Sequence, residues 1–184
     1  MNIPNLLTII RLFMVPVFVF TYLSVDSFLG RCLAAGIFLA AAVTDILDGY
    51  IARKYNKITD FGKLADPVAD KMMQLSAVFC LAYKNRFSFW IIIVFLLKEP
   101  VLIIGSLNLL KEKFVVQSKR TGKIATIALF IALMIIMVTD EAIINKQVAT
   151  LIMCVCIIFT VVAFFDYVSI YFKVKESRAK SKKI

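Results

Sequence analysis

Histidine is absent from this chain of 184 residues, so it offers neither an imidazole general base nor a histidine metal ligand. Any proton acceptor must therefore be a carboxylate, a lysine, a tyrosine or a cysteine. The cysteines are few, and no Cys-x-x-Cys pair occurs. All four lie in apolar runs, at Cys32, Cys80, Cys154 and Cys156. We interpret them as small buried hydrophobic residues rather than as a disulfide framework.

Acidic residues are also scarce: 12 Asp and Glu stand against 22 Lys and Arg, which gives a net charge of +10. The chain is 61% hydrophobic and has a mean hydropathy of +0.89, whereas about 45–50% apolar residues are usual in soluble domains. This composition predicts an integral membrane protein in contact with membrane lipids. Its basic charge favours anionic headgroups or phosphorylated substrates, and we expect no nucleic-acid partner.

Long apolar runs predict an all-α, polytopic membrane protein with six transmembrane helices in one bundle, at about 20 residues per span. The first run lacks a basic leading region and a small-x-small cleavage site, so it is predicted to be a span rather than a cleaved signal peptide. A single domain of residues 1–172 is expected, followed by a basic tail at 173–184. The predicted spans are 5–24, 32–53, 63–83, 88–110, 122–139 and 147–171.

Lysine and arginine are unevenly divided between the two sides of this bundle. Most of them fall around 53–63, around 111–123 and in the tail, whereas the alternate loops hold Arg31, Lys84, Arg86 and Lys146. Cytoplasmic loops carry the excess of positive charge. The pattern predicts a cell-membrane protein with both termini and the 53–63 loop in the cytoplasm.

Four aspartates flank that loop, although a charged side chain within a span costs about 2.5–3.5 kcal/mol on insertion. On helices, Asp45 and Asp48 lie three residues apart and Asp66 and Asp70 four apart, so each pair shares a face. Carboxylates without histidine favour Mg²⁺ or Mn²⁺ over zinc. Two such ions, about 3.5–4 Å apart, would hold a phosphoryl group during a displacement.

Small residues accompany the aspartates. Gly49 and Ala52 fall on the stripe of the first pair, and Gly62 lies one turn before Asp66, which leaves room for a large ligand against the backbone. A plainer alternative is that the acids form salt bridges with nearby basic residues. That alternative accounts for two or three of the four aspartates more easily than for all of them.

The motif formed by these residues, D-x2-D-G-x2-A-R-x8-G-x3-D-x3-D, resembles the signature of the CDP-alcohol phosphatidyltransferase family. The resemblance extends from Asn2 to about Thr126, and more loosely through the last spans. It implies a CDP-activated lipid as donor, an alcohol as acceptor and CMP as the leaving group. Every fixed position matches, at Asp45, Asp48, Gly49, Ala52, Arg53, Gly62, Asp66 and Asp70.

The resemblance also implies roles for individual residues. The four aspartates would form a two-metal site for Mg²⁺ or Mn²⁺, and Asp70 would accept the proton of the attacking hydroxyl. Relatives are often homodimers, so a homodimer is expected. The CDP-lipid would be bound by Gly49, Ala52, Arg53, Thr59, Gly62, Asn5 and Thr8.

The acceptor is indicated by the opening N-x-P-N-x-L-T-x-x-R and by the run from Thr59 to Lys71. Both resemble the phosphatidylglycerophosphate synthase branch of the family, which implies CDP-diacylglycerol as donor and glycerol 3-phosphate as acceptor. Gly122-Lys123-x-x-Thr126 resembles the G-K-x-K-T of relatives that use glycerol phosphate, with Ala125 in place of the second lysine. The predicted ligands of the acceptor phosphate are Arg11, Lys119, Arg120 and Lys123.

Several alternatives stay open at this point. A cardiolipin synthase of the same family would use phosphatidylglycerol as acceptor, and a transporter or channel would use the carboxylates to bind cations. Transporter sites usually lie near the membrane midplane, beside broken helices, whereas these aspartates lie at one end. Arg11 is either a cation that reaches the membrane surface or part of the site. Lys98 and Glu99 either pair with each other or contact substrate, and Asp166 has no assigned role.

Overall fold

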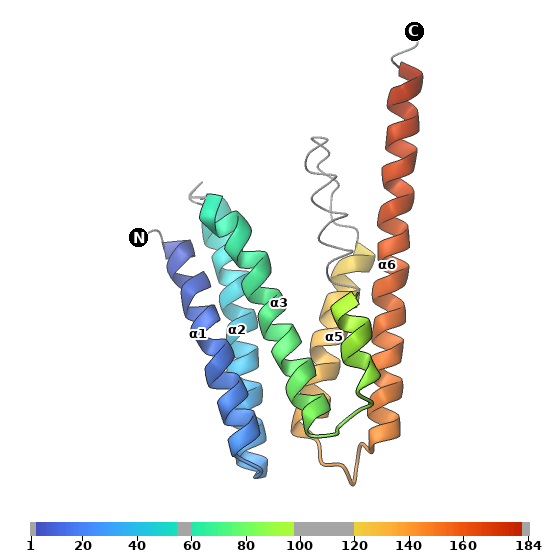
Figure 1. Ribbon diagram of the computed structural model, residues 1–184. Coiled ribbons are helices and arrows are strands. Elements are labelled where there is room, and N and C mark those ends of the chain that lie inside the picture. The colour runs from blue at the N-terminus through green and yellow to red at the C-terminus, as the bar shows by residue number, and fades with distance from the viewer. Residues whose placement is uncertain (1–2, 55–59, 98–119, 182–184) are drawn as a thin grey trace.

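The computed structural model describes residues 3–54, 60–97 and 120–181, which are helices joined by short connections (Figure 1). Residues 90–97 form one short helical stretch. No strand occurs in these three ranges, which confirms the all-α prediction. The long helices are α1 (Ile3–Ser24), α2 (Phe28–Lys54), α3 (Asp60–Tyr83), α5 (Arg120–Val138) and α6 (Lys146–Ser181).

Two of these helices are long and apolar enough to cross a membrane, over Leu6–Ser24 in α1 and Phe28–Leu47 in α2. Shorter apolar stretches occur in α5 and α6. These helices agree with a membrane protein, while the count of six crossings stays a prediction. Residues 98–110 of the predicted fourth span, with Lys98 and Glu99, lie outside the described residues.

The helix α1 buries one stripe of its surface. Its buried side chains recur every three or four residues, which is the period of one helical face. The residues between them, such as Phe13 and Phe20, are exposed and apolar, as expected for a helix that meets lipid. The buried stripe consists of Thr8, Arg11, Val15, Phe18 and Tyr22.

Aromatic side chains connect α1, α2 and α5 in the core. The ring centroids of Phe18 and Phe38 lie 5.8 Å apart, and those of Phe38 and Phe130 lie 4.8 Å apart. Such distances are typical of favourable aromatic pairs. Figure 1 shows α1, α2 and α3 as one group with α5 and α6 beside it, and α2 and α3 both pack against α5.

The order of the helices decides which termini meet. The start of α1, the end of α2 and the start of α3 lie at one end of the bundle, whereas the α1–α2 and α5–α6 connections lie at the other (Figure 1). The predicted aspartate pairs lie in the helix segments at the first of these two ends, where α2 finishes and α3 begins. The helix α6 continues to Ser181, so residues 173–181 of the predicted tail extend the last helix.

Candidate metal and substrate site

Asp45 continues the buried face of α2. That face consists of Ala34, Phe38 and Ala41, each buried, and Asp45 follows Ala41 by one turn. Small residues on this stripe let α2 lie close to its neighbours. The Asp45 side chain is 44% exposed, so the core ends here and a carboxylate occupies the boundary.

Arg11 lies against this carboxylate. Its Nη1 is 2.9 Å from Asp45 Oδ1, and only 1% of the arginine side chain is exposed. None of its three guanidinium nitrogens forms a hydrogen bond among the residues that the structure describes, so the contact with Asp45 is an ion pair. A buried guanidinium is costly unless its charge is compensated. Among the described residues, Asp45 therefore supplies the counter-charge of Arg11, and the ion pair connects that carboxylate to α1.

Thr8 lies one turn before Arg11 and is also fully buried. These two residues therefore lie on one face of α1, and that face is directed into the bundle rather than toward lipid. Asn5 lies in the first turns of α1, and its side chain lies outside the described part of the structure.

The helices α2 and α3 carry the rest of the predicted motif. Asp48, Gly49, Ala52 and Arg53 belong to the last turns of α2, while Gly62, Asp66 and Asp70 belong to the first turns of α3. This helical backbone is what the three- and four-residue spacings of the aspartates require. Their side chains lie outside the described part, and Thr59 lies outside the described residues altogether.

The surroundings of the Asp45 carboxylate are compatible with binding of a hard divalent cation. Its carboxylate is partly accessible, and carboxylate oxygens are the ligands that Mg²⁺ and Mn²⁺ prefer. The described side chains contain no group of three or more acidic residues, cysteines or histidines able to hold a metal. The three remaining aspartates of the predicted set are not among those side chains.

A small cavity of about 20 Å³ lies beside Arg11, where α1, α2, α3 and α5 meet. This volume is sufficient for about one water molecule. Gln74 lines the cavity and is itself buried. Gln74 was not among the residues predicted from the sequence, although its position one turn after Asp70 in the same helix could have indicated it.

The predicted acceptor ligands lie in different surroundings. Arg11 is buried, whereas Lys123 is exposed in α5. Ala125 is buried, and two residues correspond to about 200° around a helix, so Lys123 lies on the opposite face from Ala125. A lysine at position 125, as in the relatives' motif, would point into the bundle. The Arg120 side chain is outside the described part, and Lys119 is outside the described residues.

Comparison with known proteins identifies the class. The family model described as CDP-alcohol phosphatidyltransferase matches residues 1–165. The chain therefore belongs to the CDP-alcohol phosphatidyltransferase family, which confirms the resemblance seen in its aspartate motif.

Individual relatives are similar over different lengths. The Rickettsia bellii CDP-diacylglycerol–glycerol-3-phosphate 3-phosphatidyltransferase is 42% identical over 119 residues, which are 65% of this chain and 58% of that protein. The Bacillus subtilis protein of the same name is 30% identical over 181 residues, which cover 91% of this chain and 94% of that protein. A probable phosphatidylglycerophosphate synthase of Mycobacterium tuberculosis is 31% identical over 170 residues, or 91% and 80% of the two chains. The match thus spans little more than half of the rickettsial protein.

The Arg11–Asp45 contact leads to a first prediction. Arg11→Gln is expected to lower kcat by about tenfold or more, because Asp45 loses the cation that fixes it and a charge-assisted contact is worth about 1.5–3 kcal/mol. Steady-state kinetics with separate KM values for both substrates measure the effect. Arg11→Lys keeps the charge and is expected to recover part of kcat.

The two roles considered for Arg11 differ in these kinetics. A residue that positions Asp45 acts mainly on kcat, whereas a ligand of the acceptor phosphate acts mainly on the KM of the acceptor. A folded Arg11→Gln protein with unchanged kcat would contradict the positioning role.

Proposed function

We propose that this protein transfers a phosphatidyl group from CDP-diacylglycerol to glycerol 3-phosphate, forming phosphatidylglycerophosphate and releasing CMP. The observation that carries the proposal is family membership over residues 1–165 together with the complete aspartate motif. Relatives at 30–42% identity are named for this donor and this acceptor. The basic charge of the chain also suits two phosphorylated substrates.

In this reaction a hydroxyl oxygen of glycerol 3-phosphate forms a bond to the phosphatidyl phosphorus. The bond between that phosphorus and the oxygen of the CMP phosphate breaks, and CMP leaves with the bonding electrons. The hydroxyl proton passes to Asp70, which acts as the general base. An aspartate is a weak base, so its position beside the hydroxyl matters more than its basicity.

We propose that Asp45, Asp48, Asp66 and Asp70 hold Mg²⁺ or Mn²⁺. When bound, the ions supply the positive charge that stabilises the pyrophosphate and the leaving phosphate. Arg11 holds Asp45 in place from α1, which is the role that its 2.9 Å ion pair supports.

The substrates are proposed to lie around this carboxylate group. Arg53 would pair with a phosphate of the donor, and the small motif residues would leave the backbone open beside it. The acceptor phosphate would meet the basic side chains near the start of α5, since Arg11 is almost fully buried. The proposed CDP-lipid residues are Gly49, Ala52, Arg53, Thr59, Gly62, Asn5 and Thr8, and the proposed acceptor residues are Lys119, Arg120 and Lys123.

We further propose six membrane crossings, a homodimer, and a cytoplasmic location for the site and both termini. The uneven distribution of lysine and arginine supports this orientation. The CDP-lipid keeps its acyl chains in the bilayer while its polar part reaches the aspartate end, which gives a reason for a transferase built within a membrane.

The acceptor is tested with purified protein in detergent micelles. With CDP-diacylglycerol as donor, CMP release is expected to require glycerol 3-phosphate, and the lipid product is expected to be phosphatidylglycerophosphate. Thin-layer chromatography of the lipids and a nucleotide assay measure both products.

The open alternatives give different results in the same assay. A cardiolipin synthase ignores glycerol 3-phosphate and consumes phosphatidylglycerol. A transporter shows ion flux without any CMP release, and membership of a transferase family favours the enzyme over it. Either result would overturn the proposed reaction.

A further inference from the structure

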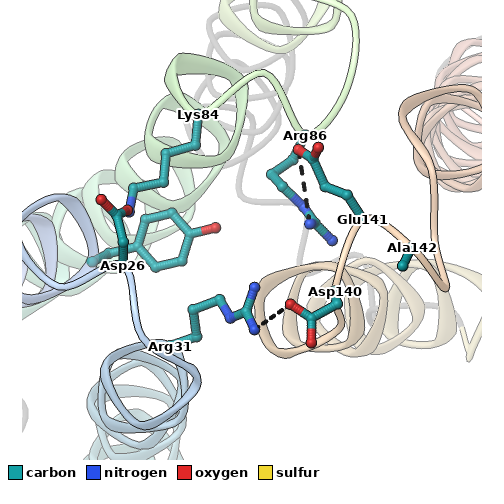
Figure 2. Close-up of a pocket in the computed structure, with 8 residues that line it drawn as sticks. Asp26, Arg31, Lys84, Arg86, Asp140, Glu141 and Ala142 are labelled. Carbon is teal, nitrogen blue, oxygen red and sulfur yellow. Dashed lines mark hydrogen bonds and ion pairs between the residues drawn. The ribbon is translucent and has the colours of Figure 1, made fainter.

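A second cavity, of about 550 Å³, lies at the end of the bundle where α1 connects to α2 and α5 connects to α6, and Figure 2 shows its lining residues. Binding sites for small ligands usually have about 300–1,000 Å³. Three connections form it: the one between α1 and α2, the one after α3, and the one between α5 and α6. Its lining residues are Tyr22, Asp26, Arg31, Lys84, Arg86, Asp140, Glu141 and Ala142.

The basic and the acidic side chains of this cavity differ in their burial. The three basic side chains are largely buried, with exposed fractions of 17% for Arg31, 21% for Lys84 and 6% for Arg86. Their acidic partners are open to solvent, with 56% for Asp140, 89% for Asp26 and 65% for Glu141. The cavity therefore has a cationic floor and an acidic rim.

The acidic side chains at the rim neutralise the three cations of the floor to different extents. Arg31 Nη2 lies 2.5 Å from Asp140 Oδ1, and Lys84 donates a hydrogen bond to Asp26, which lowers the pKa of that carboxyl. Because the carboxylate of each pair is open to solvent, water and salt screen these two contacts. In each pair, the cation and the carboxylate can therefore separate and each bind a ligand instead.

Arg86 is the least compensated cation of the three. Its Nη2 donates to the carbonyl oxygens of Ile136 at 3.0 Å and Thr139 at 2.5 Å, at the end of α5. Its distance to Glu141 is 3.9 Å, too long for a hydrogen bond. The Nε atoms of Arg86 and Arg31 have no hydrogen-bond partner among the described residues. A buried cation held mainly by carbonyl oxygens would be stabilised by an anion in the cavity that it lines.

Figure 2 shows Arg31 and Arg86 extending from different elements toward the same central space, with Asp140 and Glu141 reaching it from the α5–α6 connection. Guanidinium groups bind phosphate oxygens through paired hydrogen bonds. The acidic rim would repel a ligand that carries only negative charge. A ligand that carries a phosphate and, a few atoms away, an ammonium group matches both the floor and the rim.

We propose that this cavity binds the headgroup of a zwitterionic phospholipid, with its phosphodiester at Arg31, Lys84 and Arg86 and its ammonium at the rim acids. The cavity lies at the end of both candidate membrane spans, Leu6–Ser24 and Phe28–Leu47, which is the level of lipid headgroups. The apolar side chains of Phe28 and Leu29 are exposed beside it in the sequence, where acyl chains can lie.

The test is a lipid titration of the delipidated full-length protein in detergent, followed by native mass spectrometry. Phosphatidylethanolamine is expected to bind about tenfold or more tightly than phosphatidylglycerol, because only the former carries an ammonium for the rim. Equal binding of the two lipids would overturn the proposal. So would equally tight binding of soluble glycerophosphoethanolamine, which carries the headgroup without the acyl chains.

Variants locate the binding in this cavity. Arg31→Gln and Lys84→Gln are each expected to weaken phosphatidylethanolamine binding by about tenfold or more. Lys146→Gln is the matched control, since Lys146 is an exposed cation at the same end that bonds Asn85 rather than lining the cavity. Arg86→Gln also removes a contact with α5, so the two other variants carry the test, and wild-type affinity in both of them would refute the site.

Discussion

Replacing Asp70 by asparagine is expected to abolish turnover, and the same change at Asp45, Asp48 or Asp66 is expected to lower it by more than about a hundredfold. Asparagine keeps the volume of the side chain and removes its charge. Loss of a partner that only orients a metal ligand already costs about 10–100-fold in affinity or activity, and loss of a ligand itself should cost more. CMP release from CDP-diacylglycerol measures the effect.

The same experiment includes a control for the loss of any acidic residue. Asp166→Asn, at a position in α6 far along the chain from the motif, is expected to keep most of the activity. All variants should remain folded in the membrane fraction. Wild-type turnover in any of the four motif variants, or an equal loss in Asp166→Asn, would show that the site has been assigned to the wrong residues.

Removal of divalent cations is expected to have an equally large effect. With EDTA, turnover should fall to background, and Mg²⁺ or Mn²⁺ should restore it, because four carboxylates without histidine suit hard cations. Zn²⁺ is not expected to replace them. The measurement is the rate of CMP release before and after the chelator is titrated with each metal.

Metal binding can also be measured without turnover. Electron paramagnetic resonance of Mn²⁺ should detect bound ion in the wild-type protein and a weaker affinity in Asp45→Asn. Full activity in the presence of chelator would contradict the two-metal proposal, whatever the fate of the aspartate variants.

Local patterns in the sequence were enough to predict the helices and the position of the aspartate motif. Periodicity places Thr8 and Arg11 on one face of a helix regardless of what that face contacts, and both prove to be buried. The aspartate motif is local, confined to two helix ends and the loop between them, so its spacing could be read directly. An apolar run indicates only the part of a helix that faces hydrocarbon. The helix α6 is longer than its apolar run, because polar residues continue the helix to Ser181.

Which charged groups meet depends on how the helices pack, and the sequence patterns did not predict it. Arg11 could have reached a membrane surface, and its pairing with Asp45 depends on α1 packing against α2. From the sequence, Arg31 and Arg86 contributed only to the comparison of basic residues between the two sides of the membrane. They share one cavity because three connections, distant along the chain, fold to the same end of the bundle. Helical periodicity fixes the face of each residue, but the choice of neighbouring helices arises from the packing of many side chains together, and no single segment encodes it.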